Sequence, residues 1–392
     1  MTDRLYYTDA YLSRFTARVT GREADRVYLD RSAFYPASGG QPHDTGLLSG
    51  IPVTAVADEG DRVAHVLAEP LAAESVEGQI DWPRRFDFMQ QHTGQHLLSA
   101  VLHERFGLGT VSVHLGEEAS TIDIETASIT PAQIIEAERA ANETVFENRP
   151  VTVSFEDAAA AAGLRKASGR EGALRIVTIA DLDRSACGGT HVRATGEIGP
   201  VSIRRLDKVR GIVRVGFLCG TRAVRRARLD FDALARVAQI FSAPLDEAAA
   251  LTAAQRDALK DAARKLRAAE TELARHHGRE LYASAEPAAG LRLAVLRRYE
   301  GAPETLRALA HSFCEQPGAL LAASLADPPS VLYAASADTG IDAGAVVRAV
   351  LAQAGGRGGG NARLAQGSVP DAAALDSVVD RLINACEVPA PR

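Results

Sequence analysis

Two histidines stand four positions apart in the segment His92-Thr93-Gly94-Gln95-His96. If this segment is helical, the two imidazoles face the same side and can bind one metal ion. The segment is not the H-E-x-x-H motif of metalloproteases, because Thr93 stands where that motif carries its glutamate base. The pair therefore predicts metal binding without the general base of a metalloprotease.

A second pair with the same spacing is Cys187 and His191 in the segment ACGGTH. Gly188 and Gly189 disfavour a helix here and predict a tight loop that turns both side chains inward. Together the two pairs supply three imidazoles and one thiolate, a tetrahedral zinc set, so we predict one Zn²⁺ per chain. Four protein ligands are typical of structural zinc, whereas catalytic zinc usually keeps one position for water, and the residues leave this choice open.

A glycine-containing loop, FYPASGGQP over residues 34–42, lies between two strand-like runs. It is either an ordinary hairpin turn or a place where the backbone approaches a ligand closely beside the polar Gln41.

Residues 201–228 carry nine basic residues against one acid, Asp207, in a chain whose 44 Lys+Arg and 50 Asp+Glu give a net charge of −6. Two interpretations are open: a surface whose cations pair with acids elsewhere, or a contact with nucleic-acid phosphates. The nine are Arg204, Arg205, Lys208, Arg210, Arg214, Arg222, Arg225, Arg226 and Arg228.

Composition sets the class of protein. The chain has 392 residues, 46% hydrophobic and 24% charged, as in ordinary globular proteins. Four cysteines without a C-x-x-C pair are too few for a disulfide scaffold. No signal-peptide pattern and no apolar run near the roughly 18 residues of a membrane span is present, so we expect a cytoplasmic protein with no membrane partner.

The elements that must position these residues are read from hydrophobic periodicity, and the fold class predicted is α+β. Short strands and turns over 1–80 indicate a small β-barrel, and a helix capped by Asp81 and ended by Gly107 follows. Residues 81–222 form the zinc-binding domain, 223–285 a helical linker or hairpin, and 286–392 a small α/β domain. Leu259, Leu266 and Leu273 form a short heptad seam, which suits either an intrachain hairpin or a homodimer, so we expect a monomer or homodimer.

The segment Gly355–Asn361 holds five glycines and Arg357. It lacks the Gly-Lys-Ser/Thr ending of a P-loop, so no ATP site is expected. Its place between two helical runs predicts a loop that faces a ligand or RNA.

Three segments together resemble the AlaX-type alanyl-tRNA editing proteins, relatives of the editing domain of alanyl-tRNA synthetase. They are FYPASGGQPHDTG (34–46), DWPRRFDFMQQHTGQHLL (81–98) and ACGGTHVRATGEI (186–198). The stretch GGRGGGNARLAQG (355–367) resembles the C-terminal domain of alanyl-tRNA synthetase. The resemblance covers almost the full chain and indicates the long form of the family.

The resemblance implies a substrate and a set of roles. The substrate is tRNA(Ala) wrongly charged with serine or glycine, and the reaction is hydrolysis of the ester to the terminal ribose. By motif matching, His92, His96, Cys187 and His191 are the zinc ligands, and Gln41, His92 and His96 are catalytic. Ser38, Gly39, Gly40 and Gln41 contact the substrate together with Ser32, which stands where the family often has a threonine. The residues expected to contact RNA are Arg204, Arg205, Lys208, Arg210 and Arg357.

Two other functions compete with this one. A non-catalytic, zinc-stabilised RNA-binding protein would bind the same metal, and a metallohydrolase could act on another ester. Neither metal motif contains a carboxylate, which argues against two-metal phosphoester chemistry.

Overall fold

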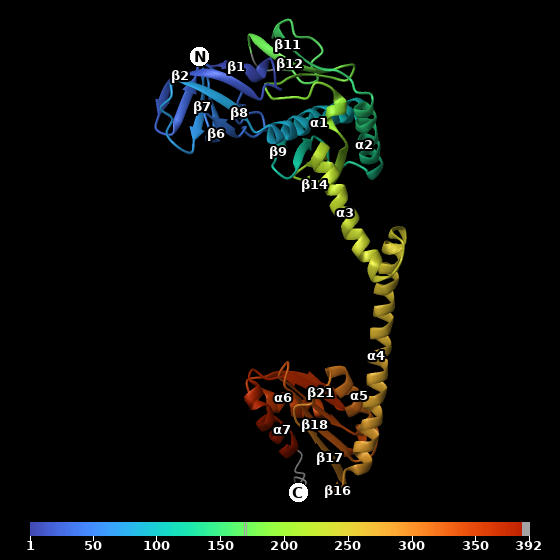
Figure 1. Cartoon of the computed structure of the whole chain (residues 1–392). Helices are drawn as coiled ribbons and strands as arrows, with labels where there is room; N and C mark the ends of the chain where they lie inside the picture. The colour runs from blue at the N-terminus through green and yellow to red at the C-terminus, as the bar shows by residue number, and fades with distance from the viewer. Residues whose placement is uncertain (168, 170, 386–392) are drawn as a thin grey trace. The chain divides into compact units, whose positions relative to one another are not determined.

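The computed structural model describes residues 1–167, 169 and 171–385. They form an α+β protein with several sheets and seven α-helices, which confirms the predicted fold class. Internal contacts divide the chain into two compact units, Met1–Gln239 and Ile240–Arg392 (Figure 1). None of the described helices combines the length and the hydropathy that crossing a bilayer requires.

The first unit begins with six antiparallel strands that pair in a closed ring, where the sequence predicted short strands and turns. Alternate residues point inward; in the last strand Val76, Gly78 and Ile80 are buried. In ring order the strands are β2 (Arg14–Glu23), β3 (Arg26–Leu29), β7 (Arg62–Leu67), β6 (Ile51–Glu59), β5 (Gly46–Leu48) and β8 (Ser75–Ile80). A parallel pair, β1 (Asp3–Arg4) and β4 (Arg31–Ser32), lies beside it.

The helix that carries the first histidine pair is α1 (Trp82–Phe106). The Asp81 carboxylate accepts a hydrogen bond from the Arg84 amide at 3.3 Å, and Gly107 ends the helix with φ 66°, both as predicted. Every residue from Phe88 to Leu102 is buried, so α1 is enclosed on all sides rather than lying on the surface.

Two sheets and a second helix, α2 (Pro131–Phe146), enclose α1. The core between them is apolar and includes Leu98, Ile122, Val177 and Phe217. The four-stranded sheet runs β14 (Val201–Val209), β15 (Ile212–Cys219), β10 (Ser120–Ile124) and β9 (Thr110–Leu115). The three-stranded sheet runs β11 (Val151–Asp157), β12 (Ala173–Ile179) and β13 (Asp183–Ala186).

A buried ion pair joins the ring to α1. Arg85 is fully buried and donates to the Asp44 carboxylate, with Nε at 2.9 Å from Oδ1. The same guanidinium donates to the carbonyls of Ala10 and Ala33. Because all three guanidinium nitrogens reach an acceptor, the pair fixes the loop before Asp44 against the start of α1.

After α3 (Gly220–Ile240), the second unit packs helices on a six-stranded sheet. Its sheet order is β16 (Pro287–Ala288), β17 (Leu291–Leu296), β18 (Ala319–Leu325), β19 (Ser330–Ala335), β21 (Leu364–Ser368) and β20 (Arg357–Gly360). The helices are α4 (Ala248–Ser284), α5 (Pro303–Cys314), α6 (Ala343–Gln353) and α7 (Leu375–Asn384). Short 3₁₀ turns elsewhere cover Leu5–Tyr7, Thr195–Ile198, Leu245–Glu247, Ala337–Thr339 and Ala372–Ala374.

The glycine run corrects one prediction. Residues 357–360 do not form a loop but the edge strand β20, paired with β21. A Cβ at Gly358 or Gly367 would lie 2.5 or 2.3 Å from Leu351 Cδ1 of α6. The glycines therefore allow α6 to pack directly on this sheet edge. The sequence suggested a loop because glycine has a low propensity for strands.

The predicted helical segment, residues 223–285, lies partly in the first unit and partly in the second. Helix α4 packs against α5, with Ala274 and Gly278 buried in the second unit, while α3 belongs mostly to the first. Leu259, Leu266 and Leu273 are 68, 60 and 56% exposed on α4. The four-part domain division stays a proposal.

Candidate metal centre

Four side chains from α1 and the loop after β13 converge on one point inside the first unit. The ligand atoms of His92, His96, Cys187 and His191 all lie within 4.8 Å of one another. Cys187 Sγ is 3.4 Å from Nε2 of both His92 and His191. Tetrahedral zinc with ordinary bond lengths separates its ligand atoms by roughly 3.3–3.8 Å, a range that contains both of these Sγ–Nε2 distances.

Each of the three imidazoles is held through its other nitrogen. His92 Nδ1 lies 2.8 Å from Gln41 Oε1, His96 Nδ1 2.9 Å from Asp183 Oδ2, and His191 Nδ1 3.2 Å from Thr93 Oγ1. Carbonyl and carboxylate oxygens only accept, and the Thr93 hydroxyl is already donated to Met89 O, so each Nδ1 carries the proton. The Nε2 lone pairs therefore remain for a metal, the arrangement usual for metal-binding histidines.

Asp183 is a member of the site that sequence reasoning missed. Its carboxylate accepts from His96, from Arg165 Nε at 2.6 Å and from the Ser185 hydroxyl. Burial raises the pKa of Asp183, but the hydrogen bond and charge of His96 and the charge of Arg165 lower it to about 2. Its position four residues before Cys187 was the available signal.

The charges of the cluster favour a thiolate. Burial raises the pKa of the Cys187 thiol, but the charges of His92 and His191 outweigh it and hold this pKa well below its usual value. Burial and the charge of His92 lower the pKa of His191 to about 3. Burial lowers the pKa of His96, but its hydrogen bonds to Asp183 and Cys187 outweigh this and raise it to about 9. A metal that binds therefore displaces a proton from His96, because neutral imidazoles and a thiolate are the forms that bind a metal.

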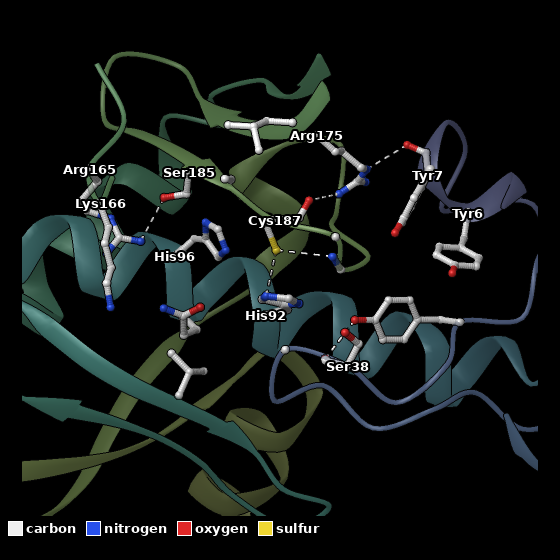
Figure 2. A pocket seen from close by; sticks show the side chains of 18 of the residues that line it. Tyr6, Tyr7, Ser38, His92, His96, Arg165, Lys166, Arg175, Ser185 and Cys187 are labelled. Carbon is white, nitrogen blue, oxygen red and sulfur yellow. Dashed lines mark hydrogen bonds between the residues drawn. The ribbon is translucent and has the colours of Figure 1, made fainter. Parts of the chain in front are cut away.

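The loop that carries Cys187 is held tightly. Arg175 Nη1 donates to Cys187 O at 2.7 Å, and its Nε donates to Tyr7 O at 3.0 Å (Figure 2). A Cβ at Gly189 would lie 2.2 Å from His92 Cε1, so only glycine lets the loop pass this ring. The two glycines thus form the inward-turning loop that the sequence predicted.

The cluster opens into a cavity of about 640 Å³. Its walls carry Tyr7, Tyr35, Arg165 and Lys166 besides the metal cluster, and Figure 2 shows Lys166 and Arg165 near His96. In the described part of the chain the one carboxylate that lines this cavity is Asp58, which is ion-paired with Arg4.

The predicted substrate loop lies at the same cavity. Ser38 and Gly39 line it, and the backbone of Ser38 pairs with that of Gln41 in a tight turn that includes Gly40. Gln41 is 2% exposed; besides holding His92, its Nε2 donates to Thr190 Oγ1 at 2.8 Å. Gln41 therefore joins the glycine loop to the metal-binding loop.

Ser32 is buried on β4, beside the closed ring. Its hydroxyl lies 2.7 Å from His65 Nε2 and accepts from the Phe34 amide, and Ser32 is not among the cavity-lining residues. His65 Nδ1 lies 3.0 Å from Val27 O and must donate to it, so Nε2 accepts the Ser32 proton.

Most of the basic run is paired with acids. Arg204, Arg205, Arg214, Arg222, Arg226 and Arg228 each form an ion pair. Lys208, Arg210 and Arg225 have none among the described residues. Lys208 and Arg210 stand at the tip of the β14–β15 hairpin, whereas Arg357 is exposed on β20 in the second unit.

Comparison with known proteins gives matches in both units. Residues 174–215 match the second additional domain of threonyl- and alanyl-tRNA synthetases, and residues 290–387 match the DHHA1 domain. An alanine–tRNA ligase of Methanoregula boonei is 32% identical over 96% of this chain and 42% of its own length. The alanyl-tRNA editing protein AlaX-L of Pyrococcus horikoshii is 35% identical over 58% of this chain and 60% of its own.

The chain thus spans about half the length of the curated relatives that it matches. The solved C-Ala domain of Aquifex aeolicus alanyl-tRNA synthetase aligns over 25% of this chain and 97% of that domain, with 26% identity. The TM-score of this alignment is 0.21, which is too low to support an argument about the fold.

Proposed function

Because this chain is a relative of the AlaX-type alanyl-tRNA editing proteins and of alanine–tRNA ligases, we propose that it hydrolyses mischarged tRNA(Ala). The substrates proposed are Ser-tRNA(Ala) and Gly-tRNA(Ala), and the cofactor is one zinc ion per chain. The observation that carries the proposal is the four-ligand cluster, with all three imidazoles held through Nδ1, at the floor of a cavity.

The residues of the cavity have separate tasks in ester hydrolysis. His92, His96, Cys187 and His191 would hold the zinc, which as a Lewis acid polarises a carbonyl or activates water. Gln41 and Asp183 act through His92 and His96 and are positioning residues. Lys166 places positive charge at the cavity, where the phosphates of the tRNA 3′ end can be neutralised, whereas the charge of Arg165 is paired with Asp183. The absence of an unpaired carboxylate among the described cavity residues favours activation of water without a carboxylate base.

A deacylation assay with Ser-tRNA(Ala), Gly-tRNA(Ala) and Ala-tRNA(Ala) tests this proposal. The zinc-loaded protein is expected to release serine or glycine and to spare alanine. His96→Ala should lose metal and activity together, because one of four ligands is removed. His103→Ala is the matched control, since His103 lies on the same helix but is exposed.

The competing function is a zinc-stabilised RNA-binding protein. Four protein ligands would fill a tetrahedral zinc, which is typical of a structural site. Metal-loaded protein that binds tRNA(Ala) without releasing any amino acid would establish this alternative.

Further parts of the proposal concern partners. The tip residues Lys208 and Arg210, with Arg204, Arg205 and Arg357, are proposed to contact tRNA. The chain is proposed to be a monomer or a homodimer, and in the homodimer the exposed seam of Leu259, Leu266 and Leu273 would pair the two chains. We place the activity in the cytoplasm, where translation proceeds.

A further inference from the structure

Gln95 lies between two of the metal-binding residues and has no part in the contacts described above. It lies on α1, three residues after His92 and one residue before His96, and it lines the cavity beside both. Residues three apart lie on one helix face, so its side chain starts from the same face as that of His92. The residue is 4% exposed, so its amide is largely removed from bulk water.

Among the described residues, only the nitrogen of the Gln95 side-chain amide has a hydrogen-bond partner. Gln95 Nε2 donates to Ser99 Oγ at 2.9 Å, and the Thr110 hydroxyl donates to the same Ser99 oxygen at 2.8 Å. The carbonyl oxygen Oε1 accepts no hydrogen bond from any described residue. It is also not among the fully enclosed unpaired atoms, which in the described residues are Gln90 Oε1 and Ser120 Oγ. Because Gln95 lines the cavity, a largely buried acceptor without a donor among the described residues is available to a bound group.

Other polar groups near the metal cluster are already used. The Tyr35 hydroxyl donates to Ser38 O at 3.0 Å, and the Ser185 hydroxyl donates to Asp183. Gln41 Oε1 accepts from His92 and from the Thr190 amide. The Ser32 hydroxyl donates to His65 Nε2. Gln95 differs from these groups because none of the described residues donates to its carbonyl oxygen, and because it lines the cavity beside His92 and His96.

We propose that the Gln95 carbonyl recognises the side-chain hydroxyl of serine at the metal-bound end of the substrate. The proposal rests on the proposed function and deepens it by naming a specificity residue. A serine hydroxyl donates to the carbonyl, whereas the methyl group of alanine would cover it and leave it unpaired. A site built to bind a hydroxyl rejects an analogue without one more strongly than a purely apolar pocket can. Glycine has no side chain, so a water molecule can remain hydrogen-bonded to the Gln95 carbonyl when the glycine substrate binds.

The test compares two substitutions of glutamine on one helix. Gln95→Met keeps the length of the side chain and removes the acceptor. Gln90→Met makes the same change where Nε2 donates to Glu197 O, away from the cavity. We expect Gln95→Met to lower the ratio of kcat/KM for Ser-tRNA(Ala) over Gly-tRNA(Ala) by about 10–100-fold, with zinc content unchanged. Gln90→Met should leave this ratio within about twofold of the wild-type value.

An unchanged ratio in Gln95→Met would overturn the proposal, whether both activities stay the same or fall equally. A ratio that changes in Ser32→Ala instead would assign the serine preference to Ser32.

A binding measurement separates this proposal from the proposed function. The probes are non-hydrolysable amides of serine and of alanine with 3′-amino-adenosine, titrated by calorimetry. We expect the wild-type preference for the seryl probe to fall about 10–100-fold in Gln95→Met. If the wild type prefers the seryl probe but releases no amino acid from tRNA, the proposed function fails and the role of Gln95 stands. If the two probes bind equally to the wild type, the role of Gln95 fails.

Discussion

At the scale of residues, the candidate centre depends on how the imidazoles are held. Gln41, Asp183 and Thr93 come from a loop, a strand and the metal-binding helix itself, and each occupies one Nδ1. This fixes the tautomer and the direction of each ring before a metal arrives. Thr93 occupies the position at which a metalloprotease helix carries its base, and here its oxygen holds His191 instead.

Removing the carboxylate behind His96 should weaken metal binding. Asp183→Ala leaves His96 Nδ1 without its acceptor and Arg165 without its partner. We expect zinc affinity to fall about 10–100-fold, measured by competition with a chromogenic chelator. Glu156→Ala is the control, because Glu156 is ion-paired with Arg184 in the same sheet and does not contact a ligand. Equal affinities in the two variants would contradict the role of Asp183.

His65 should make the first unit sensitive to acid. Burial lowers its pKa from 6.5 to about 4, although the hydrogen bond to Val27 O acts in the opposite direction. The unfolded chain therefore takes up a proton below about pH 6.5 while the folded chain does so only near pH 4. Stability is unaffected above pH 6.5 and falls by up to about 3 kcal/mol as the pH drops to 4.

The measurement is urea unfolding followed by the fluorescence of Trp82, the single tryptophan, which lies at the start of α1. His65→Gln removes the titrating group, so the decline between pH 6.5 and 4 should be smaller in that variant. Parallel declines in the two proteins would assign the acid sensitivity to other groups.

At the scale of elements, one enclosed helix and two turns assemble the centre. Helix α1 supplies two ligands at its middle, where it is buried on all sides. The ring supplies Gln41 on a tight turn, and the loop after β13 supplies Cys187 and His191. In the second unit the close approach of α4 to α5 similarly depends on small residues, Ala274 and Gly278.

Gly278→Ala should destabilise the second unit. A Cβ at this position would lie 2.4 Å from Leu309 O and 3.1 Å from Phe313 N of α5, and both are backbone atoms. The helices must separate, which costs about 1–3 kcal/mol and outweighs the roughly 1 kcal/mol that alanine adds to helix propensity.

Thermal unfolding of the full chain, followed by circular dichroism at the helix band, measures this effect. Glu270→Ala on the exposed side of α4 is the control and should change little. A Gly278→Ala protein that is as stable as the wild type, or more stable, would show that the two helices are not in close contact.

At the scale of the whole molecule, the candidate tRNA contacts are distributed over both units. The hairpin tip with Lys208 and Arg210 belongs to the first unit, and Arg357 lies on the edge strand of the second. An aminoacyl end offers little surface, so affinity for tRNA must come mainly from phosphates and shape. Two weak sites on one RNA gain from effective concentration.

Substitution of the unpaired cations should weaken tRNA binding in a salt-dependent way. In the double variant Lys208→Ala/Arg210→Ala, the slope of log affinity against log salt should become shallower by about 2, one per lost phosphate contact. Arg226→Ala/Arg228→Ala is the control, because both arginines are ion-paired with Asp230 and Asp232. If both variants show the same slope as the wild type, the hairpin tip does not contact phosphates.

The sequence by itself determined the main helix of the first unit and the candidate metal ligands. Periodicity and caps predicted α1 from Asp81 to Gly107, because these signals act within a few residues. Paired spacing of His and Cys predicted the four ligands that the fold brings within 4.8 Å. The prediction of a loop at the glycine run was wrong. The run forms a strand against which Leu351 of α6 packs at Gly358, and such a contact between elements cannot be read from local sequence.

Only the tertiary structure decided the contacts between distant residues. Asp183 behind His96 lies 87 positions away in the chain, and Gln41 behind His92 lies 51 away. Three of the six ion pairs in the basic run, those of Arg204, Arg214 and Arg222, also depend on acids that folding brings close, such as Asp87 and Asp123. The physical reason is that local propensity acts through neighbouring residues, whereas hydrogen bonds and ion pairs form wherever burial leaves a polar group in need of a partner.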